Sequence, residues 1–145
     1  MDRLVLTWDD VHKDCLELAA LIVESKVEHK GIVAVARGGL FVAGILAHIL
    51  DIRSISTICA RSYTREGVAN PEVAIEGHLP EVLQTPYLLV DDLADSGNTF
   101  GALLECRYHK ATTAALYKKS LSRITPDHYI TNIDSSRWIV FPWEV

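Results

Sequence analysis

The chain has 145 residues and a formal net charge of −5, and 49% of its residues are hydrophobic. This length suits one domain with a substantial core. No apolar run reaches the roughly 18 residues that a membrane span needs, and no signal segment opens the chain, so we expect no integral membrane association. The acidic balance argues against a general nucleic-acid surface, so we expect no nucleic-acid partner. Three scattered cysteines without a C-x-x-C pair favour a cytoplasmic location over a disulfide framework or a zinc site.

The first third of the chain predicts strands and helices in alternation. Residues 4–8 predict a short strand, and Thr7 with Asp10 resembles a capping box that opens a helix. Residues 31–36 are continuously apolar, as expected for a strand covered on both faces. A pair of glycines breaks this strand, and residues 40–50 predict a helix that is apolar nearly all round and therefore buried.

The alternation continues in the rest of the chain. Residues 53–63 predict another strand, and residues 64–86 form a long polar connection rich in glycine and proline, which in a compact domain is functional or disordered. Residues 87–90 predict a buried strand, followed by a helix near residues 100–107 and a strand near residues 112–117. Strands that alternate with helices predict an α/β fold with a parallel sheet.

The most informative stretch is Asp91–Thr99, which directly follows the apolar strand at residues 87–90. Two adjacent carboxylates end the strand, and a loop of small polar residues leads into a helix. Ligands of open parallel sheets bind at the carboxyl ends of strands, and the N–H groups at a helix start bind anions. Glycine lets the backbone approach an anion, and Ser96 and Thr99 offer hydroxyl donors. The stretch therefore predicts a phosphate loop beside an acid pair that suits hydroxyl groups or a hard cation.

Asp95 lies inside this loop, where its negative charge opposes phosphate binding. A carboxylate about 7 Å from a phosphate charge costs roughly 2 kcal/mol at an effective dielectric constant of about 20. We therefore predict that Asp95 acts at a reacting centre, as a base or beside developing positive charge. A helix N-cap is the alternative, for which Asp is well suited, and one residue can serve in both ways.

A second loop of the same kind follows the strand at residues 31–36. Arg37 stands there beside Gly38 and Gly39. A guanidinium group next to two glycines at the carboxyl end of a strand favours diphosphate binding. The alternative is a tight turn that merely needs glycine.

Residues 87–99 resemble the phosphoribosyl-pyrophosphate signature of type I phosphoribosyltransferases, in which apolar residues precede two acids, a variable pair and Asp-Ser/Thr-Gly-x-Thr. Residues 31–39 resemble the family's pyrophosphate loop. Residues 127–129 and 136–144 resemble the end of bacterial xanthine phosphoribosyltransferases, with a Trp-Ile pair and a late Pro-Trp-acid. The likeness spans about residues 30–145.

The resemblance implies a single-domain type I phosphoribosyltransferase-like fold over residues 1–145, with a central, mostly parallel sheet flanked by helices. It also implies a mobile lid at about residues 64–86 and a small carboxyl-terminal hood at about residues 119–145 that binds the base. The implied reaction moves the 5-phosphoribosyl group from phosphoribosyl pyrophosphate to N9 of a 6-oxopurine (xanthine, guanine or hypoxanthine) and releases pyrophosphate. The implied cofactor is Mg²⁺, and related enzymes are homodimers or homotetramers.

The resemblance also assigns residues to this reaction. Asp95 would be the catalytic base that takes the N7 proton of the purine. Asp91 and Asp92 would hold the ribose hydroxyls directly or through Mg²⁺-bound water, so they are the candidate metal ligands. A cis peptide bond would join Ala36 to Arg37. The residues implied to bind phosphoribosyl pyrophosphate come from the two loops: Arg37, Gly38, Gly39, Asp91, Asp92, Ala94, Asp95, Ser96, Gly97, Asn98 and Thr99.

Recognition of the base is expected from the last third of the chain. Counting back ten residues from Tyr129 places the family's base-reading lysine at Lys119, with Lys118 as the alternative and two solvated lysines as a third interpretation. Trp138 offers a flat face on which a purine ring gains about 0.5–1.5 kcal/mol by stacking, unless it packs in the core of the hood. Ile139 would accept a hydrogen bond at its backbone carbonyl, a role that depends on the resemblance alone.

Three matters stay open at this level. Arg65 is the only arginine or lysine of the lid, so the resemblance leaves the lid's contact with pyrophosphate undefined, and a disordered loop is the alternative. A non-catalytic phosphoribosyl-pyrophosphate-binding regulator of the same fold is the alternative function, although Asp95, Lys119 and Trp138 argue against it. The 6-oxo group is common to the three purines, so these residues do not choose among them.

Overall fold

The computed structural model describes residues 2–68, 72–77, 86–106 and 110–144. Its elements in chain order are β1 (Arg3–Val5), α1 (Trp8–Glu24), β2 (Ile32–Ala36), α2 (Gly38–Ile49), β3 (Ile55–Tyr63), β4 (Glu72–Glu76), β5 (Leu88–Val90), β6 (Leu93–Ala94), α3 (Asn98–Cys106), β7 (Thr112–Ala114), β8 (Tyr117–Lys119), β9 (Thr131–Ile133), β10 (Trp138–Val140) and the short 3₁₀ helix η1 (Pro142–Glu144).

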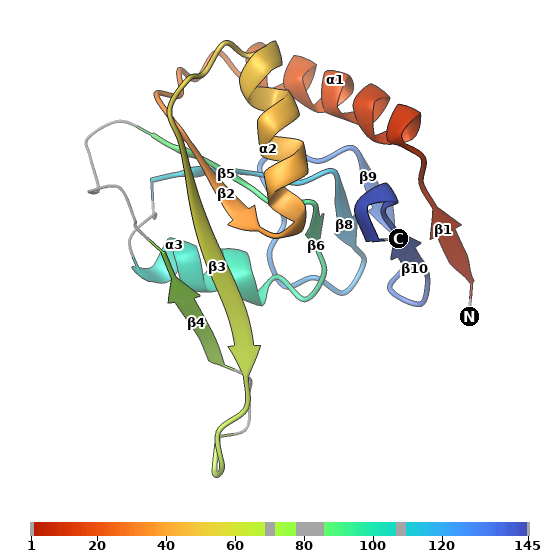
Figure 1. Cartoon of the computed structure of the whole chain (residues 1–145). Coiled ribbons are helices and arrows are strands. Elements are labelled where there is room, and N and C mark those ends of the chain that lie inside the picture. Colours follow the sequence, from red (N-terminus) through yellow and green to blue (C-terminus); the bar gives the residue numbers. More distant parts are fainter. Residues whose placement is uncertain (1, 69–71, 78–85, 107–109, 145) are drawn as a thin grey trace.

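The central sheet has the strand order β4-β3-β2-β5-β7 within the described part of the chain (Figure 1). Strands β3, β2, β5 and β7 run parallel to one another, whereas β4 pairs antiparallel with β3. Ile32 of β2 lies opposite Ile55 of β3 on one side and Leu88 of β5 on the other. The predicted α/β fold with a mostly parallel sheet is confirmed.

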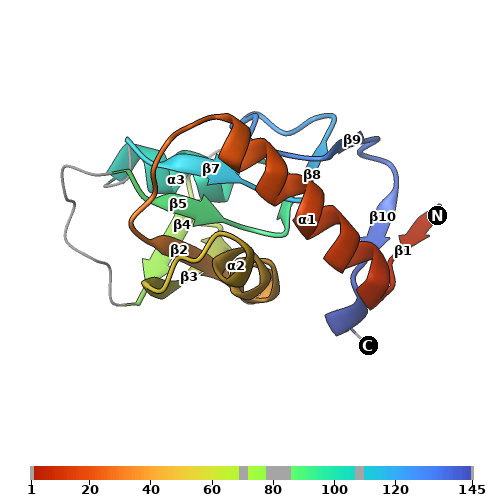
Figure 2. The same cartoon turned by 90° about the horizontal axis from the view of Figure 1, so that it is seen from above.

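Helices cover both faces of this sheet (Figure 2). Ile32 and Ala34 of β2 belong to the core cluster that includes the buried residues of α1 and α2. Val33 and Val35 face the other way and share a second cluster with Phe100 of α3. Because successive side chains of a strand point to opposite faces, a continuously apolar β2 requires cover on both.

The capping box at the start of α1 is confirmed. The Thr7 side chain accepts a hydrogen bond from the Asp10 N–H at 3.1 Å, and the Thr7 N–H donates to the Asp10 carboxylate at 2.8 Å. Helix α1 then buries Val11, Cys15 and Leu18 against the sheet. The strand predicted at residues 4–8 is shorter, because the capping box already begins the helix at its end.

Helix α2 is buried on one face only, which corrects the prediction of a helix buried all round. Val42 and Leu46 are fully buried, but Leu40, Phe41 and Ile49 are 41%, 40% and 39% exposed. An apolar sequence shows that every face of a helix can be buried. It does not show that other parts of the same chain bury it.

The strand predicted at residues 112–117 is divided between two sheets. β7 is the last strand of the central sheet, and β8 pairs with β6 and β9 in a smaller parallel sheet. The change of sheet falls at Ala115 and Leu116, both completely buried. The prediction of one continuous strand was wrong because apolar residues continue through this junction. The junction directs β8 toward the carboxyl-terminal segment.

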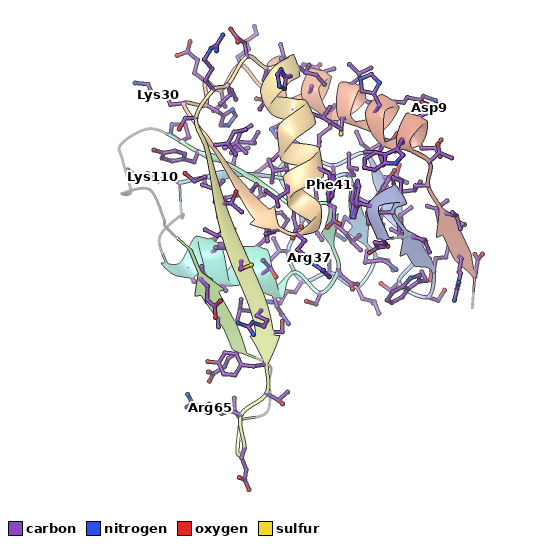
Figure 3. All side chains as sticks on the ribbon, viewed as in Figure 1. Asp9, Lys30, Arg37, Phe41, Arg65 and Lys110 are labelled. Atoms are coloured by element: carbon purple, nitrogen blue, oxygen red, sulfur yellow. The ribbon has the colours of Figure 1, made fainter. Side chains whose placement is uncertain are left out.

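The connection predicted at residues 64–86 contains a strand that the sequence did not indicate. β4 pairs antiparallel with β3, and together they form a ribbon that projects from the body of the molecule (Figure 1). Arg65 lies near the tip of the ribbon (Figure 3) and forms an exposed ion pair with Glu72 at 3.5 Å. Residues 69–71 and 78–85 of the predicted lid lie outside the described residues, so the lid stays a prediction.

The two ends of the described chain lie side by side (Figure 1). β1 pairs parallel with β10, and Arg3 lies opposite Trp138. The pairing places the first strand of the chain against the segment on which base recognition is predicted. In the described part of the chain, no helix is long and apolar enough to cross a membrane.

Candidate active site

Two loops meet at the carboxyl edge of the central sheet, because β2 and β5 are neighbouring parallel strands. After β2, Arg37 leads directly into Gly38 and Gly39 at the first turn of α2, a junction called the Arg37 loop below, and the loop after β5 begins with Asp91 and Asp92. A Cβ atom at Gly39 would lie 2.6 Å from the carbonyl oxygen of Val90, and one at Gly38 would collide with the Asp92 carboxylate. Gly39 is therefore required by close contact between backbone segments, whereas at Gly38 the contact is with a side chain, and a turn that merely needs glycine does not account for Gly39.

Arg37 lies where β2 passes into α2, and Figure 3 shows it at the first turn of that helix. The peptide bond between Ala36 and Arg37 is cis, as the resemblance implied. The Arg37 side chain is exposed and forms no ion pair within the described residues. Its guanidinium group is therefore available to an anion placed over the loop.

The loop after β6 leads into α3, which begins at Asn98, two residues earlier than predicted. Gly97 has a φ of +84°, a conformation that other residues rarely adopt. The Ser96 hydroxyl accepts a hydrogen bond from the Asn98 N–H at 3.2 Å. Asp95 is exposed, and its carboxylate accepts no hydrogen bond from the described residues. The helix-cap alternative for Asp95 therefore finds no support, because Ser96 makes the capping contact.

The acid pair at the end of β5 is poorly solvated. The Asp91 carboxylate accepts a hydrogen bond from the Asp92 N–H at 2.8 Å. Burial raises the pKa of Asp91 well above its ordinary value, and the nearby charge of Asp92 raises it further. Burial also raises the pKa of Asp92, and the charge of Glu144 adds to this. Such a pair is favourable for a site that receives a cation or hydroxyl donors, since either compensates the buried charge.

Replacement of Asp91 by Asn tests this electrostatic cost. Because the folded-state pKa is raised above 3.8, the folded chain binds more protons than the unfolded chain above that pH. The free energy of unfolding should therefore fall as the pH rises through the window between the two pKa values. We expect Asp91→Asn to reduce this fall and to raise the melting temperature of the ligand-free protein, as measured by calorimetry between about pH 4 and 8. An unchanged pH profile would show that Asp91 ionises in the folded protein as it does in water.

A cavity of about 860 Å³ joins these loops to the carboxyl-terminal segment. Arg37, Gly38 and Asp92 line it from the loops, and Trp138 and Glu144 line it from the opposite side. Trp138 is 55% exposed, so it is not packed in a core and presents its ring to solvent. The sequence analysis did not anticipate the remaining lining residues, which are Arg3, Leu40, Phe41, Val140 and Trp143.

Stacked aromatic rings connect the first turn of α2 to the carboxyl-terminal segment. The rings of Phe41 and Trp143 are stacked with their centroids 4.7 Å apart, and Phe141 stacks on Trp143 at the same distance. Offset stacking of this kind contributes about 0.5–1.5 kcal/mol per pair beyond the buried area. The stack therefore fixes one wall of the cavity relative to the Arg37 loop.

Lys119 lies beside the Trp138 segment, although it does not line this cavity. It is 5% exposed, and its ammonium group donates a hydrogen bond to the carbonyl oxygen of Arg137, the residue before Trp138. The Lys118 ammonium donates instead to the Lys119 carbonyl oxygen at 3.1 Å. Ile139 is buried in the core. Neither Asp95, Ser96 nor Ile139 is among the described residues that line the cavity.

One residue of this region was missed by the sequence analysis. The Arg123 N–H donates to the Ser96 carbonyl oxygen at 2.9 Å, and its Nε donates to the Asn98 side-chain oxygen at 2.9 Å. Arg123 thus contacts the phosphate loop from outside the motif. No spacing rule in a single sequence connects it to that loop, so only the tertiary structure reveals it.

The fold and site define an α/β domain in which Arg37, Gly38 and Asp92 line one cavity together with the exposed ring of Trp138. A model of the phosphoribosyl transferase domain family matches residues 5–145. The chain belongs to this family. It is similar to the xanthine-guanine phosphoribosyltransferases of Gluconobacter oxydans (36% identity, with 96% of this chain and 83% of the relative covered) and Chromohalobacter salexigens (34% identity, 99% and 85%).

Solved structures show the same likeness. The purine phosphoribosyltransferase of Pyrococcus horikoshii is 33% identical, with a TM-score of 0.83 over 100% of this chain and 95% of that chain. The xanthine-guanine-hypoxanthine phosphoribosyltransferase of Helicobacter pylori is 25% identical, with a TM-score of 0.82 over 99% and 94%. The recognition of a type I phosphoribosyltransferase fold from the sequence motifs is confirmed.

Proposed function

We propose that this chain is a purine salvage enzyme that transfers the 5-phosphoribosyl group from phosphoribosyl pyrophosphate to N9 of a 6-oxopurine and releases pyrophosphate. The observation that carries the proposal is the cavity in which Arg37 and Asp92 face Trp138. A guanidinium group suits the pyrophosphate, a half-buried carboxylate suits the ribose hydroxyls, and an exposed indole ring suits the flat base. The purine substrates in the names of the relatives support the same assignment.

The sugar phosphate would bind across the two loops. The residues from Ala94 to Thr99 would hold the 5′-phosphate at the start of α3, where backbone N–H groups favour an anion. Arg37, Gly38 and Gly39 would hold the pyrophosphate, and Asp91 and Asp92 would accept hydrogen bonds from the ribose hydroxyls. The reacting C1′ would then lie between the acid pair and the ring of Trp138.

Asp91 and Asp92 would also hold Mg²⁺, directly or through water. Mg²⁺ prefers oxygen ligands and is commonly bound through one or two carboxylates together with substrate oxygens. The described residues contain no cluster of three or more His, Cys, Asp or Glu side chains suited to a metal, so the substrate would complete the coordination. The raised pKa values of this acid pair fit such a site, because a cation would compensate the buried charge. When bound, Mg²⁺ supplies positive charge that neutralises the departing pyrophosphate.

Asp95 would act at the reacting centre. As the bond from C1′ to pyrophosphate breaks and the bond to purine N9 forms, positive charge develops on the ribose ring and the purine loses its N7 proton. The Asp95 carboxylate would take this proton, and its negative charge would favour the cationic sugar. Its exposed position and free carboxylate in the ligand-free chain support this role.

A pyrophosphate-release assay tests the proposal. The purified chain is given Mg²⁺, phosphoribosyl pyrophosphate and one base at a time, namely xanthine, guanine, hypoxanthine, adenine, orotate or uracil. We expect pyrophosphate release with one or more of the 6-oxopurines and none without Mg²⁺. Tight binding of phosphoribosyl pyrophosphate without release for any base would contradict the proposal and favour a non-catalytic regulator.

The assignment of the base-reading lysine gives a matched pair of variants. The Lys119 ammonium group contacts the segment that carries Trp138, whereas the Lys118 ammonium group hydrogen-bonds only to the Lys119 carbonyl among the described residues. Loss of a hydrogen bond to a charged group costs about 1.5–3 kcal/mol, which is roughly 10- to 150-fold. We expect Lys119→Met to raise the KM for the purine by about this factor, and Lys118→Met to leave it within about 2-fold. Steady-state kinetics at saturating phosphoribosyl pyrophosphate measure both, and the reverse order would assign the role to Lys118.

We further propose a homodimer or homotetramer. Leu40, Phe41 and Ile49 of α2 and Ile55 of β3 are each about 40% exposed, and a groove of about 810 Å³ runs between these elements. An exposed apolar surface of this kind marks a protein contact.

We also propose a cytoplasmic location, since Cys15 and Cys59 are free thiols that suit a reducing compartment.

A further inference from the structure

The phosphate loop is supported from outside by residues 122–124, which follow β8. A Cβ atom at Gly97 would lie 2.6 Å from the Ile124 nitrogen and 2.8 Å from the Ser122 hydroxyl oxygen. The Arg123 N–H donates to the Ser96 carbonyl oxygen at 2.9 Å. The backbone of residues 122–124 therefore packs directly against the turn that opens α3.

The Arg123 side chain continues this contact along the helix. Its Nε donates to the Asn98 side-chain oxygen at 2.9 Å, and its guanidinium group lies over Gly101, where a Cβ atom would collide with it. Gly97 and Gly101 thus leave room for the backbone and side chain of the same supporting segment. An arginine with two fixed contacts is held in one orientation, which a mobile surface side chain is not.

The positive charge of Arg123 is paired with no acid at ion-pair distance in the described part of the chain. Glu72 and Glu105 line the same hollow as Arg123, but within the described residues Arg123 forms no ion pair. A guanidinium group one turn from the start of α3 adds to the positive potential at that helix end. Asp95 is the only acid among residues 94–99, and its negative charge opposes an incoming phosphate. The positive charge of Arg123 offsets part of this repulsion.

We infer that Arg123 is a positioning residue for the 5′-phosphate. It holds Asn98 and the first turn of α3 in the conformation that binds the anion, and its charge favours the anion at a distance. The inference rests on the proposed function, because it assumes that the loop binds the phosphate of a ribose 5-phosphate group. The Ser122 N–H also donates to the Lys119 carbonyl oxygen at 3.0 Å, so the same short segment connects the predicted base-reading lysine to the phosphate loop.

The test compares a nucleotide with its nucleoside, which differ only in the 5′-phosphate. Calorimetric titration would give the affinities of the wild-type chain and Arg123→Ala for guanosine 5′-monophosphate and for guanosine. We expect Arg123→Ala to weaken nucleotide binding about 10- to 100-fold and to leave nucleoside binding within about 2-fold. Arg123→Lys retains the charge but loses the Nε donor, so its affinity for the nucleotide should lie between those of the wild type and Arg123→Ala. Lys13→Ala removes one exposed positive charge on α1, and it should resemble the wild type.

Equal weakening of nucleotide and nucleoside by Arg123→Ala would overturn the inference, because it would indicate general damage to the fold. Unchanged nucleotide binding would overturn it as well. Asn98→Ala and the double variant test whether Arg123 acts through Asn98. In the Arg123→Ala background, loss of the Asn98 side chain should weaken nucleotide binding little further. Additive losses of affinity would show that Arg123 does not act through Asn98. The two proposals can fail separately. If the chain binds nucleotide better than nucleoside because of Arg123, yet releases no pyrophosphate with any base, the proposed reaction is contradicted and this inference stands.

Discussion

Asp95→Asn is expected to abolish most turnover while leaving the fold intact and without weakening substrate binding. A positioned general base contributes about 10²- to 10⁴-fold to a rate, and we expect kcat to fall within this range. The Asp95 side chain is exposed and its carboxylate accepts no hydrogen bond from described residues, so the substitution removes no structural contact. Because the lost interaction belongs to the transition state, kcat and kcat/KM should fall together.

The measurement is steady-state pyrophosphate release with the preferred purine, accompanied by a melting curve for each variant. Asp9→Asn is a suitable control, because Asp9 is an exposed acid on α1, far from the loops (Figure 3). It should retain wild-type kinetics. Turnover of Asp95→Asn near the wild-type level, with an unchanged melting temperature, would show that the base has been assigned to the wrong residue.

Gly39→Ala is expected to damage both stability and activity. Its Cβ atom would lie 2.6 Å from the Val90 carbonyl oxygen and 3.1 Å from the Asp91 Cα, and both are backbone atoms that cannot rotate away. Forcing a methyl group into a packed interior costs about 1–3 kcal/mol. The strain would separate the Arg37 loop from the acid pair, so we expect the affinity for phosphoribosyl pyrophosphate to fall as well.

Gly44→Ala provides the matched control in the same helix. A Cβ atom at Gly44 would meet nothing within 4 Å, and alanine in a helix interior is favoured over glycine by about 0.5–1 kcal/mol. Denaturant unfolding should therefore show a lower free energy of unfolding for Gly39→Ala and an equal or higher one for Gly44→Ala. If Gly39→Ala were as stable as the wild type and bound phosphoribosyl pyrophosphate normally, close contact between the loops would not be a requirement of the site.

The sequence predicted the parts of the fold that depend on neighbouring residues. The capping box of Thr7 and Asp10, the buried strand β2 and the order of strands and helices are local patterns, and the structure contains them. The strand β4 and the division of residues 112–117 between two sheets were not predicted. Both depend on which strand lies alongside, and pairing of that kind leaves little trace in a single sequence.

The same distinction applies to the site. The positions of the loops after β2 and β5 were predicted, because each combines glycine with charged residues within a few positions. The short strand β6 within the second loop and the start of α2 at Gly38 were not predicted. The meeting of Arg37 and Asp92 with Trp138 was expected only through the family resemblance. Phe41 and Arg123 were missed, since each reaches the site through a contact with residues far away in the sequence.

The parallel pairing of β1 with β10 has a consequence for how the site is assembled during synthesis. Residues Arg3–Val5 are synthesised well before their partners Trp138–Val140. Domains fold as the chain emerges, so the central sheet and its helices can form before β10 and the aromatic residues around it are made. Substitutions in residues 3–5 would therefore affect the segment that carries Trp138, although the two strands lie more than a hundred positions apart in the sequence.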